Sequence, residues 1–280
     1  MSTWTPGPAW LFCPADRPER YAKALAAADV VILDLEDAVA PAKRPEAREA
    51  LLAAAKEGTL DPDRVVVRVN GADTPDHAAD LATTAAAGVR RVMLAKSESP
   101  EVVAGIDHEV VLLVETPLGI EQAGALAAVD NAVALMWGAD DLVAGLGGTA
   151  SRRPDGSYRD IARYARSRAL VAAKAYGLLA LDAVHMDIPD TEGLAAECED
   201  AVAIGFDATV AIHPSQVAVI RAAYTPDPER VDWATRLLDH VGDDRGVTTF
   251  EGRMVDGPIY LQAERVLRLA AATNHEGGQG

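Results

Sequence analysis

Eight short apolar runs recur along roughly the first 215 residues, and segments with the spacing of amphipathic helices lie between them. The runs are residues 9–15, 30–37, 64–70, 90–96, 110–115, 132–141, 178–184 and 208–214. Continuous Val, Leu and Ile runs are typical of parallel strands buried on both faces. Their number and size predict an α/β fold, a (β/α)8 TIM barrel.

A Gly-rich stretch, Gly145 to Gly148, is the nearest match to a dinucleotide-binding turn, but it is short and its glycines are poorly spaced. A doubly wound sheet usually has fewer strands and carries such a turn after its first strand. We therefore interpret the stretch as an ordinary loop that connects a strand to a helix.

Beyond the eighth run, the pattern predicts a helix, a Gly-rich elbow (GRMVDGP, residues 252–258) and a closing amphipathic helix. We predict a barrel over residues 1–224 and a C-terminal helical extension over residues 225–280. Because the extension is additional to the barrel, it could be a lid, a dimerisation arm, or both, packing on the barrel or on a neighbouring subunit. Its last residues, from Asn274, are expected to be disordered.

The charge and composition exclude several classes of partner. The formal net charge is −17 and there is no basic tract, so binding to nucleic acid or to anionic lipid is not expected. No apolar run reaches the ~18 residues of a membrane span. The N-terminus has no secretion signal, and Cys13 and Cys198 are too far apart for a CxxC motif. These features indicate a cytoplasmic protein with reduced thiols.

The chemistry of a barrel lies at the C-terminal ends of its strands. Glu115 ends the fifth run, and Asp140 and Asp141 end the sixth. Carboxylates on neighbouring strands, with few imidazoles and no Cys/His cluster, predict a site for Mg²⁺, with Mn²⁺ as the alternative, rather than for zinc. Each acid could instead cap the helix that follows it, and the pattern does not choose between the two aspartates.

Arg68 is a charge inside a buried strand, VVVRVN, where it needs a partner. It could form a salt bridge with Glu36, hold a substrate carboxylate with its planar fork, or do both. Lys96, at the end of the fourth run, could equally be a surface charge or a functional group.

Seven segments resemble the citrate lyase β-subunit-like proteins, within the wider family of malyl-CoA and citramalyl-CoA lyases and HpcH/HpaI aldolases. They occur in the family's order, from about Trp10 to about Leu267. The segments are WLFCPADRPERYAKAL, VILDLEDAVAPAKRPEAR, VRVNG, VETPLGI, WGADDL, IHPSQ and FEGRMVDGP.

The resemblance assigns roles residue by residue. It makes Glu115 and Asp141 the Mg²⁺ ligands and Arg68 the residue that holds the keto-acid carboxylate. It implies that Asp256 is an acid/base on the C-terminal arm, often supplied by a neighbouring subunit. The other implied site residues are Glu36 and Asp37, which face the reaction, Arg17 and Lys23 near the coenzyme A phosphates, and Gly138 and Ala139 against the substrate.

The resemblance implies a Mg²⁺-dependent carbon–carbon lyase that cleaves a 3-hydroxyacyl-CoA such as citramalyl-CoA, malyl-CoA or citryl-CoA. The products would be acetyl-CoA, or a related acyl-CoA, and a 2-keto acid, with thioester hydrolysis as a further activity. The alternatives are the β subunit of a multi-subunit citrate lyase and a catalytically silent barrel that binds a partner. The family suggests a homo-oligomer, a trimer or a dimer of trimers. One departure is Ala208-Thr209, where many relatives carry Gly-Lys.

Overall fold

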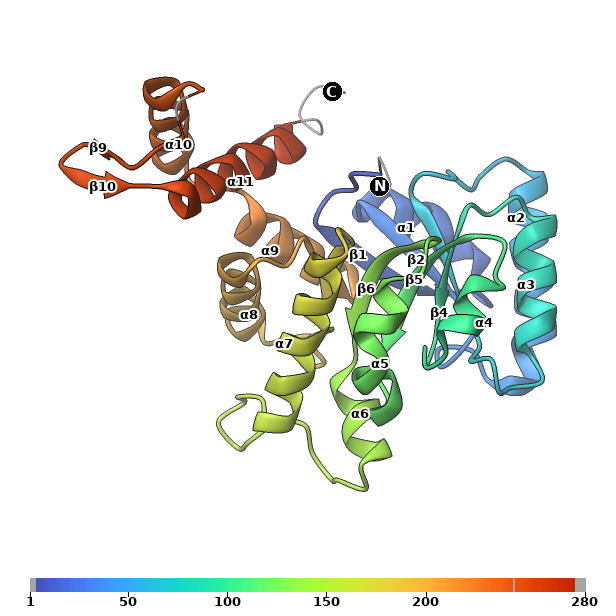
Figure 1. Ribbon diagram of the computed structural model, residues 1–280. Helices are drawn as coiled ribbons and strands as arrows, with labels where there is room; N and C mark the ends of the chain where they lie inside the picture. The colour runs from blue at the N-terminus through green and yellow to red at the C-terminus, as the bar shows by residue number, and fades with distance from the viewer. Residues whose placement is uncertain (1–3, 244, 275–280) are drawn as a thin grey trace. The chain divides into compact units, whose positions relative to one another are not determined.

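The computed structural model describes residues 4–243 and 245–274, and the end of the chain predicted to be disordered lies mostly outside this part. Eight parallel strands form a closed barrel in chain order, with β1 pairing with β8 (Figure 1). This confirms the predicted (β/α)8 barrel. The strands are β1 Ala9–Pro14, β2 Val30–Asp34, β3 Val65–Val69, β4 Arg91–Leu94, β5 Glu109–Val114, β6 Ala132–Trp137, β7 Leu179–Asp182 and β8 Ala208–Ala211.

The barrel interior is a packed core. Each strand sends apolar side chains inward, among them Trp10, Ile32, Met93, Met136 and Val210, all at most 3% exposed. Helices cover the outer face, so the strands are buried on both sides. This is why they appear in the sequence as continuous apolar runs rather than as an alternation.

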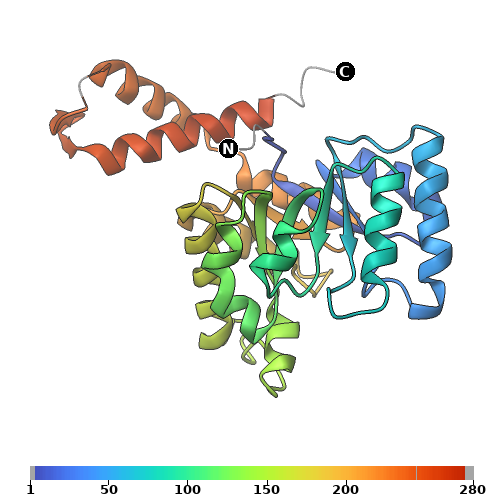
Figure 2. The same ribbon diagram turned by 45° about the vertical axis from the view of Figure 1, so that its right-hand side comes forward.

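The outer helices are α1 Tyr21–Ala27, α2 Arg44–Lys56, α3 His77–Ala86, α4 Pro100–Ala104, α5 Pro117–Ala127, α6 Ala139–Gly145, α7 Asp160–Ala175, α8 Thr191–Ile204 and α9 Pro214–Tyr224, with 3-10 turns at Pro18–Arg20 and Pro41–Lys43. Figure 2 shows α2 and α3 side by side, as Figure 1 does. Arg48 on α2 joins them through ion pairs with Asp76 and Asp80. Among the described residues, no helix is both long and apolar enough to cross a membrane.

Several predicted strands run past their observed ends. The second run was expected to reach residue 37 and the sixth to reach 141, whereas β2 ends at Asp34 and β6 at Trp137. A hydrophobic run shows where the chain is buried, not where it leaves the sheet. Strand ends predicted from such runs therefore tend to lie too far along the chain. As a result, Glu36 and Glu115 lie just beyond the strands, and Asp141 lies in the first turn of α6.

The chain forms two compact units, Met1–Ile220 and Arg221–Gly280. The second contains α10 Pro228–Val241, a hairpin of β9 Thr248–Phe250 and β10 Arg253–Val255, and α11 Gly257–Asn274. Leu237, Val255 and Tyr260 belong to its own small core. Its function as a lid stays a prediction.

Candidate active site

A cavity of about 420 Å³ opens at the C-terminal ends of the barrel strands. Residues far apart in the sequence meet there because each follows a different parallel strand. Among the predicted site residues, it is lined by Asp37, Arg68, Glu115, Gly138, Ala139, Asp140 and Asp141.

Glu115 directly follows β5 and its side chain is buried, with 3% of the residue exposed. Burial, and next the negative charge of Asp141, raise the pKa of Glu115 from 4.5 to about 8. Asp141 lies in the first turn of α6, after the neighbouring strand β6. A buried carboxylate and an exposed one therefore interact across the cavity, an arrangement that a cation would relieve.

Neither acid caps a helix, so both capping alternatives are wrong. Thr116 is the N-cap of α5, and its Oγ1 accepts a hydrogen bond from the backbone N of Gly119 at 3.0 Å. Gly138 is the N-cap of α6 and caps it without a side chain. The carboxylates of Glu115 and Asp141 are therefore not used for helix capping and are available to bind a ligand.

Gly138 has a steric reason to be glycine. A Cβ atom there would lie 2.8 Å from Cβ of Glu115 and 2.9 Å from its Oε2. Any larger residue would push the Glu115 carboxylate out of place. The structure therefore gives Gly138 a role in placing Glu115, beside the predicted contact with substrate.

Asp140 and Asp141 are adjacent but have different neighbours. Asp140 Oδ1 accepts a hydrogen bond of 2.6 Å from Ser151 Oγ, and its charge contributes to a raised pKa of Arg152. Asp141 is instead the aspartate whose charge acts on Glu115. The electrostatic effect thus pairs Glu115 with Asp141, the aspartate that the resemblance selected. Their role as metal ligands stays a prediction.

Arg68 is held mainly by Asp34, a partner that sequence reasoning did not identify. Its Nε donates to Asp34 Oδ1 at 2.7 Å and its Nη2 donates to Asp34 Oδ2 at 2.6 Å. Nη1 also lies 3.1 Å from Glu36 Oε2, the predicted ion pair. An arginine has five N–H donors and Asp34 takes two, so donors remain for Glu36 and for a ligand in the cavity.

Lys96 belongs to the same charge network rather than to the open surface. Its ammonium contacts Glu36 and lies 3.9 Å from Asp37 Oδ2 and 4.0 Å from Glu115 Oε1. Its backbone N donates to Glu115 Oε1 at 3.2 Å, and its φ is 51°, in the left-handed region. Burial raises the pKa of Glu36 in spite of the neighbouring Arg68 and Lys96. Asp37 is exposed.

The loop after α6 supplies three cavity residues that sequence reasoning missed, Ser151, Arg152 and Tyr158. The Arg152 guanidinium stacks 3.9 Å from the centre of the Tyr158 ring and pairs with Glu197 on α8. The sequence pattern predicts only an ordinary connecting loop at its start, Gly145 to Gly148. The only sequence signal was the presence of arginines and a tyrosine between the sixth run and the next helix.

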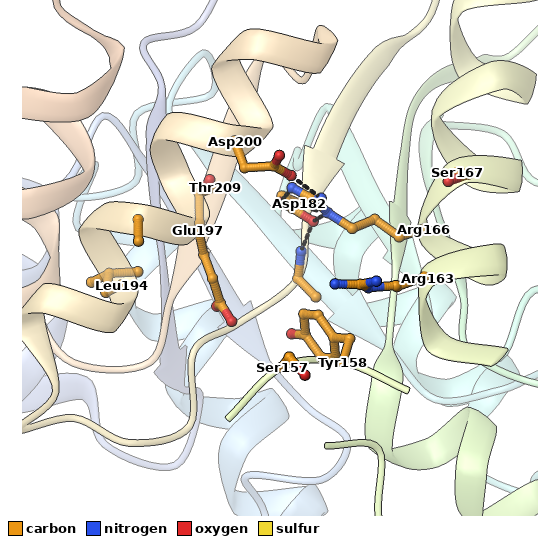
Figure 3. A pocket seen from close by; sticks show the side chains of 12 residues that line it. Ser157, Tyr158, Arg163, Arg166, Ser167, Asp182, Leu194, Glu197, Asp200 and Thr209 are labelled. Atoms are coloured by element: carbon orange, nitrogen blue, oxygen red, sulfur yellow. Dashed lines mark hydrogen bonds and ion pairs between the residues drawn. The ribbon is translucent and has the colours of Figure 1, made fainter. Parts of the chain in front are cut away.

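Tyr158 also lines a second cavity of about 400 Å³ that includes residues of α7, α8, β7 and β8 (Figure 3). In this view, Arg166 lies against the carboxylates of Asp182 and Asp200, with which it forms ion pairs. Asp182 Oδ1 also accepts a 2.7 Å hydrogen bond from Nε1 of Trp137, the last residue of β6. The ion pairs of this second cavity therefore help to fix the strand end that precedes Gly138 and Asp141.

Three other predicted site residues lie elsewhere in the fold. Arg17 precedes the first 3-10 turn with its side chain 56% exposed, and Lys23 is exposed on α1. Neither is among the residues that line the 420 Å³ cavity. Asp256 belongs to the second unit, between β10 and α11, where its backbone O accepts from the N atoms of Ile259 and Tyr260. The roles of all three stay predictions.

Within the described part of the chain, no group of three or more His, Cys, Asp or Glu side chains is arranged to hold a metal ion. A cation beside Glu115 and Asp141 would therefore take two carboxylates from this chain and its other ligands from water or substrate. That donor set fits Mg²⁺, which usually keeps several waters and binds one or two carboxylates.

Comparisons with known proteins found one matching family model and several similar proteins and structures. A family model described as HpcH/HpaI aldolase/citrate lyase matches residues 9–214. The chain is 53% identical to the citrate lyase subunit beta-like protein of Mycobacterium tuberculosis, over 99% of this chain and 100% of that one. It is 31% identical to the mitochondrial citramalyl-CoA lyase of Homo sapiens, over 87% and 79% of the two chains. The crystal structure of CitE from Mycobacterium tuberculosis in complex with magnesium, acetoacetate and coenzyme A superposes with a TM-score of 0.88, at 55% identity over 95% of this chain and 98% of that one.

Proposed function

The chain belongs to the HpcH/HpaI aldolase/citrate lyase family, and we propose that it is a Mg²⁺-dependent carbon–carbon lyase acting on a 3-hydroxyacyl-CoA thioester. The observation that carries this proposal is that Glu115, Asp141 and Arg68 line one cavity at the C-terminal ends of the strands. The complex of the M. tuberculosis relative with magnesium, acetoacetate and coenzyme A supports the choice of cation and carrier. The products would be acetyl-CoA, or a related acyl-CoA, and a 2-keto acid.

Glu115 and Asp141 are the residues that would hold the cation. They fit it because both are acids, Glu115 is buried, and the negative charge of Asp141 raises the pKa of Glu115. Bound there, Mg²⁺, or Mn²⁺ in its place, would supply Lewis-acid polarisation of the substrate oxygens and a template for their arrangement.

Arg68 would bind the carboxylate of the keto-acid half of the substrate. The bidentate contact with Asp34 fixes the plane of its guanidinium, so the remaining N–H donors are already oriented when substrate arrives. The Arg68 guanidinium also lies 4.7 Å from the centre of the Phe12 ring, which further restricts it. This preorganisation is what a lyase needs at the carboxylate next to the bond that breaks.

In the proposed reaction, a base removes the proton from the 3-hydroxyl group and the Cα–Cβ bond breaks. The hydroxyl carbon becomes the keto group, and the bonding pair passes to the thioester fragment as an enolate, which is then protonated. We assign one of these proton transfers to Asp256 on the C-terminal unit. A carboxyl group suits either transfer best when closure of a lid buries it and raises its pKa. Glu36 and Asp37 would face the reacting groups.

Arg17 and Lys23 would contact the coenzyme A phosphates. Ala208 and Thr209, which replace the family's Gly-Lys, are both buried in β8. Without that lysine the acyl carrier need not be coenzyme A, and the second candidate is the β subunit of a multi-subunit citrate lyase that acts on a carrier-protein thioester. We further propose a cytoplasmic homo-oligomer, a trimer or a dimer of trimers, with no nucleic-acid or membrane partner.

The test is an assay of the purified protein alone with Mg²⁺ and citramalyl-CoA, malyl-CoA or citryl-CoA. We expect a 2-keto acid and an acyl-CoA to appear together, and release of free coenzyme A would reveal additional hydrolysis. Turnover that appears only after carrier and transferase subunits are added would favour the citrate lyase subunit. No turnover in either assay would leave a silent barrel.

A further inference from the structure

We propose that Ser151 sets the cation selectivity of this site, because it binds Asp140 and so keeps a third carboxylate away from the cation. This inference rests on the proposed function, since it concerns the cation held by Glu115 and Asp141. It adds a residue outside the predicted ligand set that would make the site prefer Mg²⁺ to Ca²⁺.

The geometry begins with two adjacent acids on α6. Asp140 and Asp141 both lie in its first turn and both line the cavity. Among the described residues, a side-chain donor is found for Asp140 but not for Asp141, and that donor is the Ser151 hydroxyl at 2.6 Å. The Asp140 charge also interacts with the Arg152 guanidinium, but among the described residues the Ser151 hydroxyl is the direct contact that holds the Asp140 carboxylate.

The loop that carries Ser151 is built to return to α6. Gly147 has a φ of 76°, which favours glycine, and the N of Gly148 donates to Val143 O at 2.8 Å. A Cβ atom on Gly148 would lie 2.7 Å from Val143 Cγ1, so this close approach also needs glycine. Ser151 is 6% exposed, and its backbone O accepts from Arg159 N at 2.9 Å. Backbone hydrogen bonds before Ser151 and at Ser151 itself therefore fix the position of the residue that carries the hydroxyl group.

The number of carboxylates at a site affects which cation it prefers. Mg²⁺ demands near-octahedral geometry and usually binds one or two carboxylates, whereas Ca²⁺ accepts six to eight oxygens in flexible geometry. A third carboxylate would therefore favour Ca²⁺ more than Mg²⁺.

The experiment measures cation binding to the full-length protein without substrate. Metal-stripped protein is titrated by calorimetry with MgCl₂ and, separately, with CaCl₂, and the ratio of the two dissociation constants is compared between variants. In Ser151→Ala, we expect the preference for Mg²⁺ to fall by about tenfold or more, the scale on which residues behind metal ligands act. Ser151→Thr, which keeps the hydroxyl, should retain the wild-type ratio.

A double variant and a control isolate the cause. Ser151→Ala combined with Asp140→Asn should restore the wild-type ratio, because the released carboxylate is then gone. Ser157→Ala removes a hydroxyl of the same loop that donates to Asp155 at 2.7 Å, and it should leave the ratio unchanged. Each variant is checked by circular dichroism and by its melting temperature.

The outcomes separate this inference from the proposed function. If Ser151→Ala weakens both cations equally, or changes neither, the selectivity role of Ser151 is wrong, because a merely structural defect does not alter a ratio. A double variant that keeps the altered ratio overturns it as well. If the wild-type protein binds no Mg²⁺ at all, the proposed metal site fails, and this inference fails with it.

Discussion

The mouth of the barrel has two acidic regions that look alike in the sequence and differ in their partners. In the ion-paired cluster, defined by Asp34, Glu36, Arg68 and Lys96, each acid touches a cation. In the acid pair, Glu115 and Asp141, burial and next the negative charge of Asp141 raise the pKa of Glu115, and the Lys96 ammonium lies 4.0 Å from Glu115 Oε1. The acids of the ion-paired cluster stabilise the fold through their ion pairs, whereas the acid pair is available to bind a cation.

Breaking the ion-paired cluster should have the largest effect on stability. Arg68→Ala leaves the buried Asp34 carboxylate, which is 0% exposed, without a cation and with only the backbone N–H donors of Glu36 and Ala38. We expect the free energy of unfolding to fall by about 3–5 kcal/mol, measured by urea denaturation. Arg68→Lys keeps the charge and should lose less, although it cannot reproduce the fork. A loss below about 1 kcal/mol in Arg68→Ala would mean that Asp34 is solvated and that the ion-paired cluster contributes little to the stability of the fold.

The acid pair should respond to pH in the metal-free protein. The pKa of Glu115 is raised from 4.5 to about 8, so folding favours its protonated form. That contribution to stability is complete below about pH 4.5 and is lost as the pH rises towards 8. Between pH 5.5 and 7.5, we expect stability to fall by up to about 1.4 kcal/mol per pH unit from this group.

Two comparisons isolate Glu115 in this measurement. Glu115→Gln should make the pH dependence of unfolding shallower, because only the titration of this group is removed. Saturating Mg²⁺ should have the same effect on the wild-type protein, since the cation binds the ionised form. Identical slopes for the variant and the wild-type protein would show that Glu115 is not the group responsible.

Gly138 packs against Glu115 and is the N-cap of α6, the helix that carries Asp141. Its substitution should weaken Mg²⁺ binding more than it lowers the stability of the fold. In Gly138→Ala, the new Cβ atom would meet Glu115 at 2.8–2.9 Å and displace its carboxylate. We expect Mg²⁺ to bind about 10–100-fold more weakly, measured by calorimetry, as when support behind a metal ligand is lost. Gly124→Ala, on α5, where the nearest atom to the added Cβ lies 3.9 Å away, controls for the loss of glycine itself. Equal binding in wild-type protein and Gly138→Ala would mean that Glu115 is not a ligand.

The sequence could predict the barrel and the location of the acids because both depend on local pattern. An apolar run that stops at Glu115 already indicates a strand end, and strand ends of a parallel barrel share one rim. It could not predict that Arg68 is held by Asp34, because both Asp34 and Glu36 lie close to the end of β2 and only register and side-chain direction choose between them. Nor could it predict the contribution of Ser151, because a loop has no periodicity from which its path can be derived.

The smallest expected effect on stability concerns Asp37, which the resemblance groups with Glu36. Glu36 is 4% exposed and touches both cations of its cluster, whereas the Asp37 side chain is 56% exposed and lies 3.9–4.0 Å from the same two cations. Exposed ion pairs at this separation contribute about 0–1 kcal/mol, so Asp37→Asn should leave urea unfolding almost unchanged. Its effect on turnover is then a direct test of a catalytic role, free of any folding defect. A lowered kcat at wild-type stability would support the role implied by the resemblance. An unchanged kcat would assign Asp37 to the solvated edge of the ion-paired cluster, and a large loss of stability would show that the exposed acid is as important to the fold as the buried one.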